Sequence, residues 1–318
     1  MANIVYMARS AWTGLLDTIR SKAGITGSMT VSQAADAVNS ITGGDDSFDR
    51  LIDRTITEAR GSVIEIGDYA FAYCSSLTTA SFPSATSIGK YAFASCSSLT
   101  TANFRNVTNV SMSAFANCQN LQDVSIPHVS YLAENAFNTC KSLQEISFPE
   151  LLRVDSFVFY RCSKLTSVSV PSLSSMGVNV FASCKELSVI NLPSVSIIPS
   201  STFANCTSLT NVTLPMVQIV GINAFNSCSE LRTLSLPKVS TISASAFRSC
   251  YNLLSLYLLG SSIASLTGYP FASTPIGDYT TSTGGVYGSV FVPASLYDQY
   301  ISSAYWSTYA SHIVSVAD

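Results

Sequence analysis

Nine cysteines stand in a single register of the sequence, and cysteine can bind metal ions or form disulfides. The cysteines follow one another at intervals of 22 residues from Cys74 to Cys250, no C-x-x-C pair occurs, and the chain holds only two histidines. This spacing is wrong for a metal site, and an odd count leaves one thiol over in any full set of disulfides. The pattern therefore predicts a ladder of reduced thiols that pack as small buried side chains, with no metal and no cofactor.

Three other side chains could do acid–base chemistry or hold a cation. His128 follows a proline at an expected exposed turn, where the repeat places Asn106 and Glu150 beside it but no nucleophile. Asp123 and Glu145 are 22 residues apart, so we expect them on adjacent strands as a pair of carboxylates. Such pairs serve in catalysis and cation binding, but they are more often a solvated patch. The sequence has no phosphate loop, nucleophile elbow, metalloprotease or calcium-loop motif, and we predict no catalytic residues and no enzyme.

The cysteines belong to a 22-residue repeat that runs through most of the chain. Phenylalanines keep the same step from Phe71 to Phe247, and leucines keep it from Leu77 to Leu253. Each copy approximates A-F-x-x-C-x-x-L-x-x-h-x-h-P, where h is apolar, and a second apolar pair follows. The part from the leucine onward alternates apolar and polar residues as a half-buried strand does. Self-similarity at this period predicts a leucine-rich-repeat-like solenoid, whose copies stack and bury one another's apolar faces.

The repeat and its two ends divide the chain into four segments. Residues 62–260 hold nine copies of the repeat, and we expect 45–61 to be a linker and an N-terminal cap strand. Residues 1–44 contain two amphipathic stretches, which predict a short helical N-terminal module. In 261–318, a loop insertion precedes a last strand-like stretch, with Tyr287 in the leucine position, and a helical C-terminal cap. The predicted fold is a repeat solenoid, a leucine-rich-repeat-like right-handed coil with one parallel β-sheet face, the helical N-terminal module and an α/β C-terminal cap.

The combination I-G-x-x-A-F-x-x-C-x-x-L, repeated in register over about 62–260, resembles the BspA-type (Treponema-type) leucine-rich repeats of bacterial surface proteins. The resemblance implies a curved solenoid with a parallel sheet on one face, and roles in adhesion and in binding host or microbial surfaces. Proteins of that family are usually exported. Residues 1–44 resemble the short helical N-terminal module of some prophage tail-associated proteins of gut bacteria. This second resemblance implies attachment to a phage tail or to another surface assembly.

Composition and charge argue against several classes of partner. The net charge is −3 and only 11% of residues are charged, with no basic stripe that could neutralise phosphates. Nucleic acid is therefore not expected as a partner. The richest apolar stretch, 253–260, is far shorter than the ~20 residues that cross a bilayer, so we expect no membrane insertion. The first residues show no Sec signal peptide, and we expect a place on an extracellular surface or on a virion.

The sequence favours a non-enzymatic binding or adhesion protein that presents the repeat surface to a protein or glycan on a cell surface. Stiff, extended repeat arrays whose outward positions vary freely suit recognition. The resemblances suggest two settings, a prophage tail accessory protein and a bacterial surface adhesin. The alternative is a structural spacer in a larger assembly, without a ligand of its own. A hydrolase with unrecognised chemistry is the least favoured hypothesis.

Two surfaces are candidates for ligand contact. The outward strand positions carry short polar side chains in one row, which Val189 interrupts. The other candidate is Tyr279, in the Gly/Ser/Thr-rich insertion before the cap, whose composition is close to that of antibody loops. In the same insertion Phe271 keeps the register of the repeat and is expected in the core, and Thr274 takes the cysteine position. The candidate ligand-binding residues are Thr79, Thr101, Asp123, Glu145, Ser167, Asn211, Thr233 and Tyr279.

Overall fold

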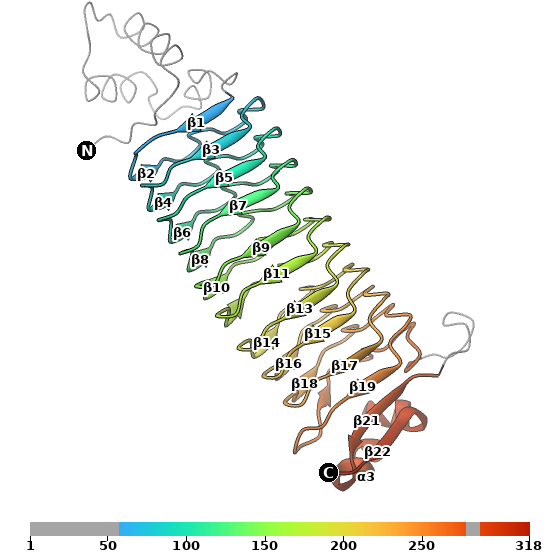
Figure 1. Ribbon diagram of the computed structural model, residues 1–318. Helices are drawn as coiled ribbons and strands as arrows, with labels where there is room; N and C mark the ends of the chain where they lie inside the picture. Colours follow the sequence, from blue (N-terminus) through green and yellow to red (C-terminus); the bar gives the residue numbers. More distant parts are fainter. Residues whose placement is uncertain (1–56, 278–286) are drawn as a thin grey trace, which may run out of the picture.

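The computed structural model describes residues 57–277 and 287–318. Over these residues the chain winds into an elongated coil in which each turn lies against the next, from β1 (Glu58–Arg60) at one end to α3 (Tyr297–Ser302) at the other (Figure 1). The predicted solenoid is confirmed. The predicted helical module at 1–44, most of the segment 45–61, and Tyr279 lie outside the described residues.

Each turn contributes one strand of three residues and one strand of two residues. We call the surface formed by the three-residue strands the long-strand face and the surface formed by the two-residue strands the short-strand face. After β1, the long-strand face continues with β3 (Thr79–Ser81), β5 (Thr101–Asn103), β7 (Asp123–Ser125), β9 (Glu145–Ser147), β11 (Ser167–Ser169), β13 (Val189–Asn191), β15 (Asn211–Thr213), β17 (Thr233–Ser235) and β19 (Ser255–Tyr257). The short-strand face consists of β2 (Glu65–Ile66), β4 (Ser87–Ile88), β6 (Asn109–Val110), β8 (Tyr131–Leu132), β10 (Arg153–Val154), β12 (Ser175–Met176), β14 (Ile197–Ile198), β16 (Ile219–Val220), β18 (Thr241–Ile242) and β20 (Ser265–Leu266).

Paired strands of the repeats run parallel and stay in the register that the repeat sets. Thr79 of β3 lies opposite Thr101 of β5, one copy later. Within β3 the central Ala80 is fully buried, whereas its neighbours Thr79 and Ser81 are partly exposed, because successive side chains of a strand point to opposite sides. The predicted strand alternation is therefore confirmed. The sequence shows only an apolar pair at the positions of the short-strand face, and the structure adds this second set of strands.

Hydrogen-bonded pairing between turns is interrupted at defined places. The long-strand face divides into the sheets β1-β3-β5-β7, β9-β11, β13-β15 and β17-β19-β21-β22, where β21 is Ser289–Pro293 and β22 is Ile313–Val316. The short-strand face divides once, between β12 and β14. Gly177 N donates to Val154 O (2.9 Å) at the preceding interface, but the matching residue in the next turn is Pro199, which has no N–H to donate. The predicted single sheet face is thus a series of shorter parallel sheets.

A third set of backbone hydrogen bonds continues through every repeat that the structure describes. At the alanine-phenylalanine corner, Phe93 N donates to Ala114 O (2.7 Å), and the residues two before and two after it, Tyr91 and Ser95, donate to the next turn in the same way. These two flanking residues have φ of 54° and 59°, in the left-handed region, and the same two positions do so in each copy from 69 to 249. This ladder couples the turns even where the long-strand face is interrupted.

The interior of the coil is filled by a stack of phenylalanines, one from each turn. Neighbouring rings from Phe71 to Phe271 are nearly parallel, with interplanar angles of 2° to 20° and ring centroids 5.1 to 5.7 Å apart. These rings are buried throughout. Phe271 completes the stack, which confirms the prediction that it belongs to the core.

The nine cysteines are buried and form no disulfides, so the predicted thiol ladder is confirmed. The structure also explains why this position of the repeat carries a side chain that can donate a hydrogen bond. Cys96 Sγ donates to Phe71 O in the preceding turn (3.0 Å), and the contact recurs from Cys118 to Cys250 at 3.0 to 3.2 Å. In the last coil Thr274 takes the cysteine position, and its hydroxyl donates to Phe271 O of its own turn (2.7 Å). The position requires a small side chain with a hydrogen-bond donor.

The C-terminal cap closes the open end of the stack. It consists of β21, the 3-10 helix η3 (Ala294–Leu296), α3, the 3-10 helix η4 (Trp306–His312) and β22. Trp306 Nε1 donates to Ala264 O (2.6 Å), and the Tyr300 hydroxyl accepts from Ala264 N (3.0 Å). Both side chains are buried, and the predicted α/β cap is confirmed. Within 57–277 and 287–318, no helix is long and apolar enough to span a bilayer.

The predicted register of the last strand is confirmed, but one of its side chains faces outward. Ser289 pairs with Ser255, which aligns Tyr287 with Leu253, yet the Tyr287 side chain is 49% exposed and stacks on the ring of His312, with centroids 4.3 Å apart. The reason lies in the next residue, Gly288, which is buried and so close to the preceding turn that an added Cβ would lie 2.9 Å from Leu253 O. This close approach of the backbone leaves no room for an inward tyrosine ring.

Candidate binding site on the long-strand face

The predicted contact residues form a row of outward positions on the long-strand face, along which the arrows β3 to β19 follow one another in Figure 1. Each is the first residue of its strand, and all have partly or largely exposed side chains. Val189 pairs with Asn211 and is 49% exposed, so it interrupts the polar row as predicted. The structure thus brings seven of the candidates onto one face: Thr79, Thr101, Asp123, Glu145, Ser167, Asn211 and Thr233.

The row is not a continuous sheet at its two acidic members. Gln122 N and Asp123 N both donate to Thr100 O, at 2.9 and 3.1 Å. No corresponding bond from Gln144 N to Gln122 O exists among the described residues, and β7 and β9 are end strands of two separate sheets. Asp123 and Glu145 therefore lie on successive strands, as predicted, but these strands are not hydrogen-bonded to each other.

The interruptions follow a pattern in the central residue of each strand. Val124 at the centre of β7 is only half-buried, and the same is true of Val168 in β11 and Val212 in β15. Each of these valine strands is followed by an interruption and then by a strand whose central residue is larger and buried, such as Ile146 in β9. Where β3 and β5 both have alanine at the centre, the strands pair closely. The sheet is therefore interrupted where the central inward residue changes from valine in one strand to a larger residue in the next.

A hollow of about 830 Å³ lies over the interruption between β7 and β9. Outward side chains of β5, β7, β9 and β11 and the residues that precede β7 and β9 line it. Asp123 and Glu145 are the only charged residues in this lining, and the half-buried Val124 supplies an apolar part. Two of the predicted contact residues therefore stand at the centre of a concave site, and Thr101 and Ser167 stand at its rim.

The lining of the hollow contains an unsatisfied polar atom. Asn103 Oδ1 is buried and has no hydrogen-bond partner among the described residues. Buried side-chain oxygens nearly always accept a hydrogen bond. This oxygen is closed to solvent, so the acceptors that the hollow presents are the two carboxylates and the side-chain amides of Gln122 and Gln144.

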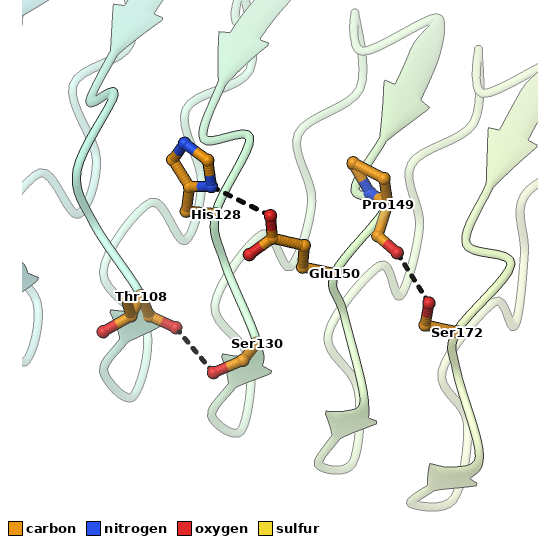
Figure 2. Close-up of polar contacts among 6 residues, drawn as sticks. All are labelled: Thr108, His128, Ser130, Pro149, Glu150 and Ser172. Atoms are coloured by element: carbon orange, nitrogen blue, oxygen red, sulfur yellow. Dashed lines mark hydrogen bonds and ion pairs between the residues drawn. The ribbon is translucent and has the colours of Figure 1, made fainter.

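His128 lies in the turn after β7 and contacts the next copy of the repeat. Its Nδ1 is 3.0 Å from Glu150 Oε1, and both side chains are more than half exposed. Figure 2 shows this contact beside two other links between successive turns, Ser130 Oγ to Thr108 O and Ser172 Oγ to Pro149 O. Glu150 is thus the predicted neighbour of His128. The setting is that of a link between exposed turns, without a nucleophile that the histidine could activate.

Two thiols in the middle of the ladder are held in the protonated, unreactive form. Burial raises the pKa of Cys162 and of Cys206 to about 12, so both stay protonated at neutral pH, whereas the thiolate is the reactive form. No group of three or more histidine, cysteine, aspartate or glutamate side chains that could hold a metal ion occurs in the described ranges.

A polar cluster on the short-strand face escaped the sequence analysis. Arg153 of β10 donates to Asp155 Oδ1 (2.8 Å), and its guanidinium carbon lies 5.4 Å from the ring centroid of Tyr131 of β8. The Tyr131 hydroxyl donates to Asp155 Oδ2, and this hydrogen bond raises the pKa of Tyr131. Tyr131 and Arg153 are one repeat apart, so their spacing could have indicated the contact. The spacing becomes informative only when the short-strand face is known to be a sheet, which the sequence does not predict.

A comparison with family models identifies the protein family of the repeats. The family model for the BspA type leucine rich repeat region matches residues 64–188 and 174–284, in six copies. The chain belongs to this family. The predicted resemblance of the repeats is thereby confirmed, whereas no comparison supports the resemblance of 1–44 to prophage tail-associated proteins. Proteins of this family and fold are generally non-enzymatic binding scaffolds, and no enzyme family is indicated.

The chain is similar to several solved structures, and the first of them, with a TM-score above 0.5, has the same fold. A leucine-rich repeat protein from Bacteroides ovatus is 22% identical, with a TM-score of 0.55, over 83% of this chain and 84% of that one. The leucine rich repeat protein of T. pallidum is 25% identical, with a TM-score of 0.44, over 56% of this chain and 78% of that one. An internalin from Listeria monocytogenes is 15% identical, with a TM-score of 0.38, over 98% of this chain and 94% of that one. No curated protein matches the chain at a significant level.

Proposed function

We propose that this protein is a non-enzymatic adhesion protein that binds a protein or glycan on a cell surface through its long-strand face. The hollow over the β7–β9 interruption is the single observation that carries this proposal, since it is a concave site of about 830 Å³ on an otherwise extended surface. Binding sites are typically concave, with a small number of polar groups that fix orientation. The hollow meets this description with Asp123 and Glu145 at its centre.

Family membership supports the same function at a coarser level, because BspA type repeats form binding scaffolds. The sequence leaves two settings open for this function. A cell-surface adhesin agrees with the repeat family, and a prophage tail accessory protein agrees with the predicted helical module at 1–44. The genes that neighbour the coding sequence separate these settings, since tail or baseplate genes indicate the second and surface-anchoring genes indicate the first.

A structural spacer is the second candidate, and one observation favours it. The ladder at the alanine-phenylalanine corner and the phenylalanine stack both run through all the described repeats, which makes the coil suited to hold two attached parts at a fixed distance. A spacer needs no ligand on the long-strand face. Failure to bind any cell surface therefore favours the spacer.

A cell-binding assay combined with a glycan array tests the proposal. The chain is compared with two variants that reverse one exposed charge each, Glu145→Arg in the hollow and Glu186→Arg in an exposed turn outside it. Adhesion through the hollow predicts binding by the wild type and by Glu186→Arg, and its loss in Glu145→Arg. Equal binding by all three proteins refutes the hollow as the site, and absence of binding by the wild type refutes the adhesion function.

A further inference from the structure

We propose that the hollow between β7 and β9 receives an arginine side chain carried by an extended segment of a protein partner. The inference deepens the proposed function and rests on it, since the long-strand face has to be the binding surface. It names the chemistry of the ligand, which neither the family nor the fold specifies.

Charge complementarity selects a cationic group. The lining of the hollow holds the two carboxylates Asp123 and Glu145 and no lysine, arginine or histidine. The two carboxylates are provided by different strands, and the amides of Gln122 and Gln144 lie beside them in the sequence and in the lining. A planar guanidinium with five donors can serve acceptors that lie on separate strands, whereas an ammonium group acts as a point charge. Arginine therefore fits this set of acceptors better than lysine.

The apolar part of the hollow fits the rest of an arginine side chain. Val124, the central residue of β7, is half-buried and lines the hollow. Arginine buries its methylene stem against apolar surface while its charged head stays with polar groups. A neutral sugar would instead gain from an aromatic ring on which to stack, and the lining contains no aromatic residue.

The interruption of the sheet provides acceptors and donors for the backbone of an extended segment. Gln144 N and Gln122 O would bond to each other in a continuous sheet, and they do not do so among the described residues. Extended peptides commonly bind to sheets by main-chain hydrogen bonds, with side-chain pockets that add specificity. An extended segment that places arginine over Val124 satisfies both requirements.

The two other interruptions of the long-strand face offer a natural comparison. At the β11–β13 interruption the first strand residues are Ser167 and Val189, and at the β15–β17 interruption they are Asn211 and Thr233. Neither pair is charged. The β7–β9 interruption is the one of these three that places two carboxylates across the gap, so arginine recognition is expected there and not at the others.

Fluorescence anisotropy with short labelled peptides tests the inference on the full chain. The probes are serine- and threonine-rich peptides with a single central arginine, lysine, glutamine or glutamate. We expect the arginine peptide to bind most tightly, and the Asp123→Asn, Glu145→Gln double variant to bind it about tenfold more weakly or worse. The control variant Glu186→Gln, Glu230→Gln neutralises two exposed carboxylates outside the hollow and should leave the affinity unchanged.

A transplant variant keeps the test decisive if the double variant is unstable. Asn211→Asp with Thr233→Glu and Arg232→Gln places the acidic pair at the β15–β17 interruption, with glutamine at the position of Gln144, and should create a second arginine-peptide site, seen as a doubled binding stoichiometry. Equal affinity for the arginine and glutamine peptides, or equal loss in the control variant, overturns the inference. If the wild type binds cells but the arginine peptide does not compete, the arginine inference fails while the adhesion function stands. If no cell or glycan is bound, the adhesion function fails independently of the peptide result.

Discussion

Replacing Phe159 by alanine should destabilise the whole array, because this ring lies at the centre of the phenylalanine stack. The ring is fully buried, and its centroid lies 5.7 Å from that of Phe137 and 5.5 Å from that of Phe181. Truncating a buried phenylalanine costs about 3–5 kcal/mol, from lost transfer free energy and the cavity left behind. The cavity would separate the two halves of the stack, and no neighbouring turn can fill it without breaking register. We therefore expect a loss of unfolding free energy in the upper half of this range.

Chemical denaturation followed by circular dichroism measures this loss, and the matched control is Ser167→Ala on the long-strand face. Ser167 is exposed and belongs to the same region of the coil, so its replacement should cost about 0.5 kcal/mol or less. Equal shifts of the denaturation midpoint for the two variants would refute the assignment of inward and outward positions.

Four other predictions follow from the contacts of the repeat and the cap. Titration with a thiol reagent should find few reactive groups in the native protein and about nine in denaturant; a count near one in denaturant would contradict the reduced ladder. Burial raises the pKa of Cys162 and Cys206 to about 12, so the folded state keeps protons that the unfolded chain loses above its usual thiol pKa of about 8.5. The free energy of unfolding should therefore fall as the pH rises from about 8.5 to about 12. A constant melting temperature across this pH range would contradict the prediction. Gly277→Ala should cost about 1–3 kcal/mol in a thermal melt, since an added Cβ would lie 2.0 Å from Phe271 O; an unchanged melting temperature would refute this close approach. His128→Ala should cost less than about 1 kcal/mol, because the pair with Glu150 is exposed; a larger loss would show that the pair matters to folding.

The period of the sequence predicts the coil because one register controls burial, pairing and stacking at once. A phenylalanine, a cysteine and a leucine at fixed steps indicate which side chains face inward, and the structure buries Phe159 and Cys162 as expected. The solenoid, the outward row on the long-strand face and the α/β cap follow from the same reasoning. The helical and strand-like stretches after residue 287 predict the cap, but they do not predict the contacts inside it.

The features that the period does not reveal depend on differences between copies. The consensus of the repeat treats all apolar residues at the centre of the long strand as equivalent. In the structure, the strand with the half-buried Val124 is followed by an interruption of the sheet, whereas the strand with the buried Ala102 is not. Pro199 removes one donor from the short-strand face, and Gly288 brings the backbone too close to leave Tyr287 inside. These are local effects of size and hydrogen bonding. They show only when the positions of neighbouring turns are known.

The candidate site likewise has features that the sequence predicts and features that appear only in the structure. The sequence identified Asp123 and Glu145 as stacked carboxylates on the outward row, and it could not show that a hollow separates their strands. Asn103, which lines the same hollow, occupies the third strand position, where most copies carry serine, threonine or asparagine. Nothing in its type distinguishes it from its equivalents, and its unpartnered oxygen appears only in three dimensions.

Amide hydrogen exchange on the chain, free and bound to the arginine peptide, tests most directly whether the long-strand face is the binding surface. Gln144 N lacks its sheet partner in the described structure, so this amide should exchange quickly in the free protein. Binding at the hollow predicts that exchange slows in the fragments that carry β7 and β9, with little change in those that carry the C-terminal cap. Protection confined to the cap or to the short-strand face, with β7 and β9 unchanged, would contradict it.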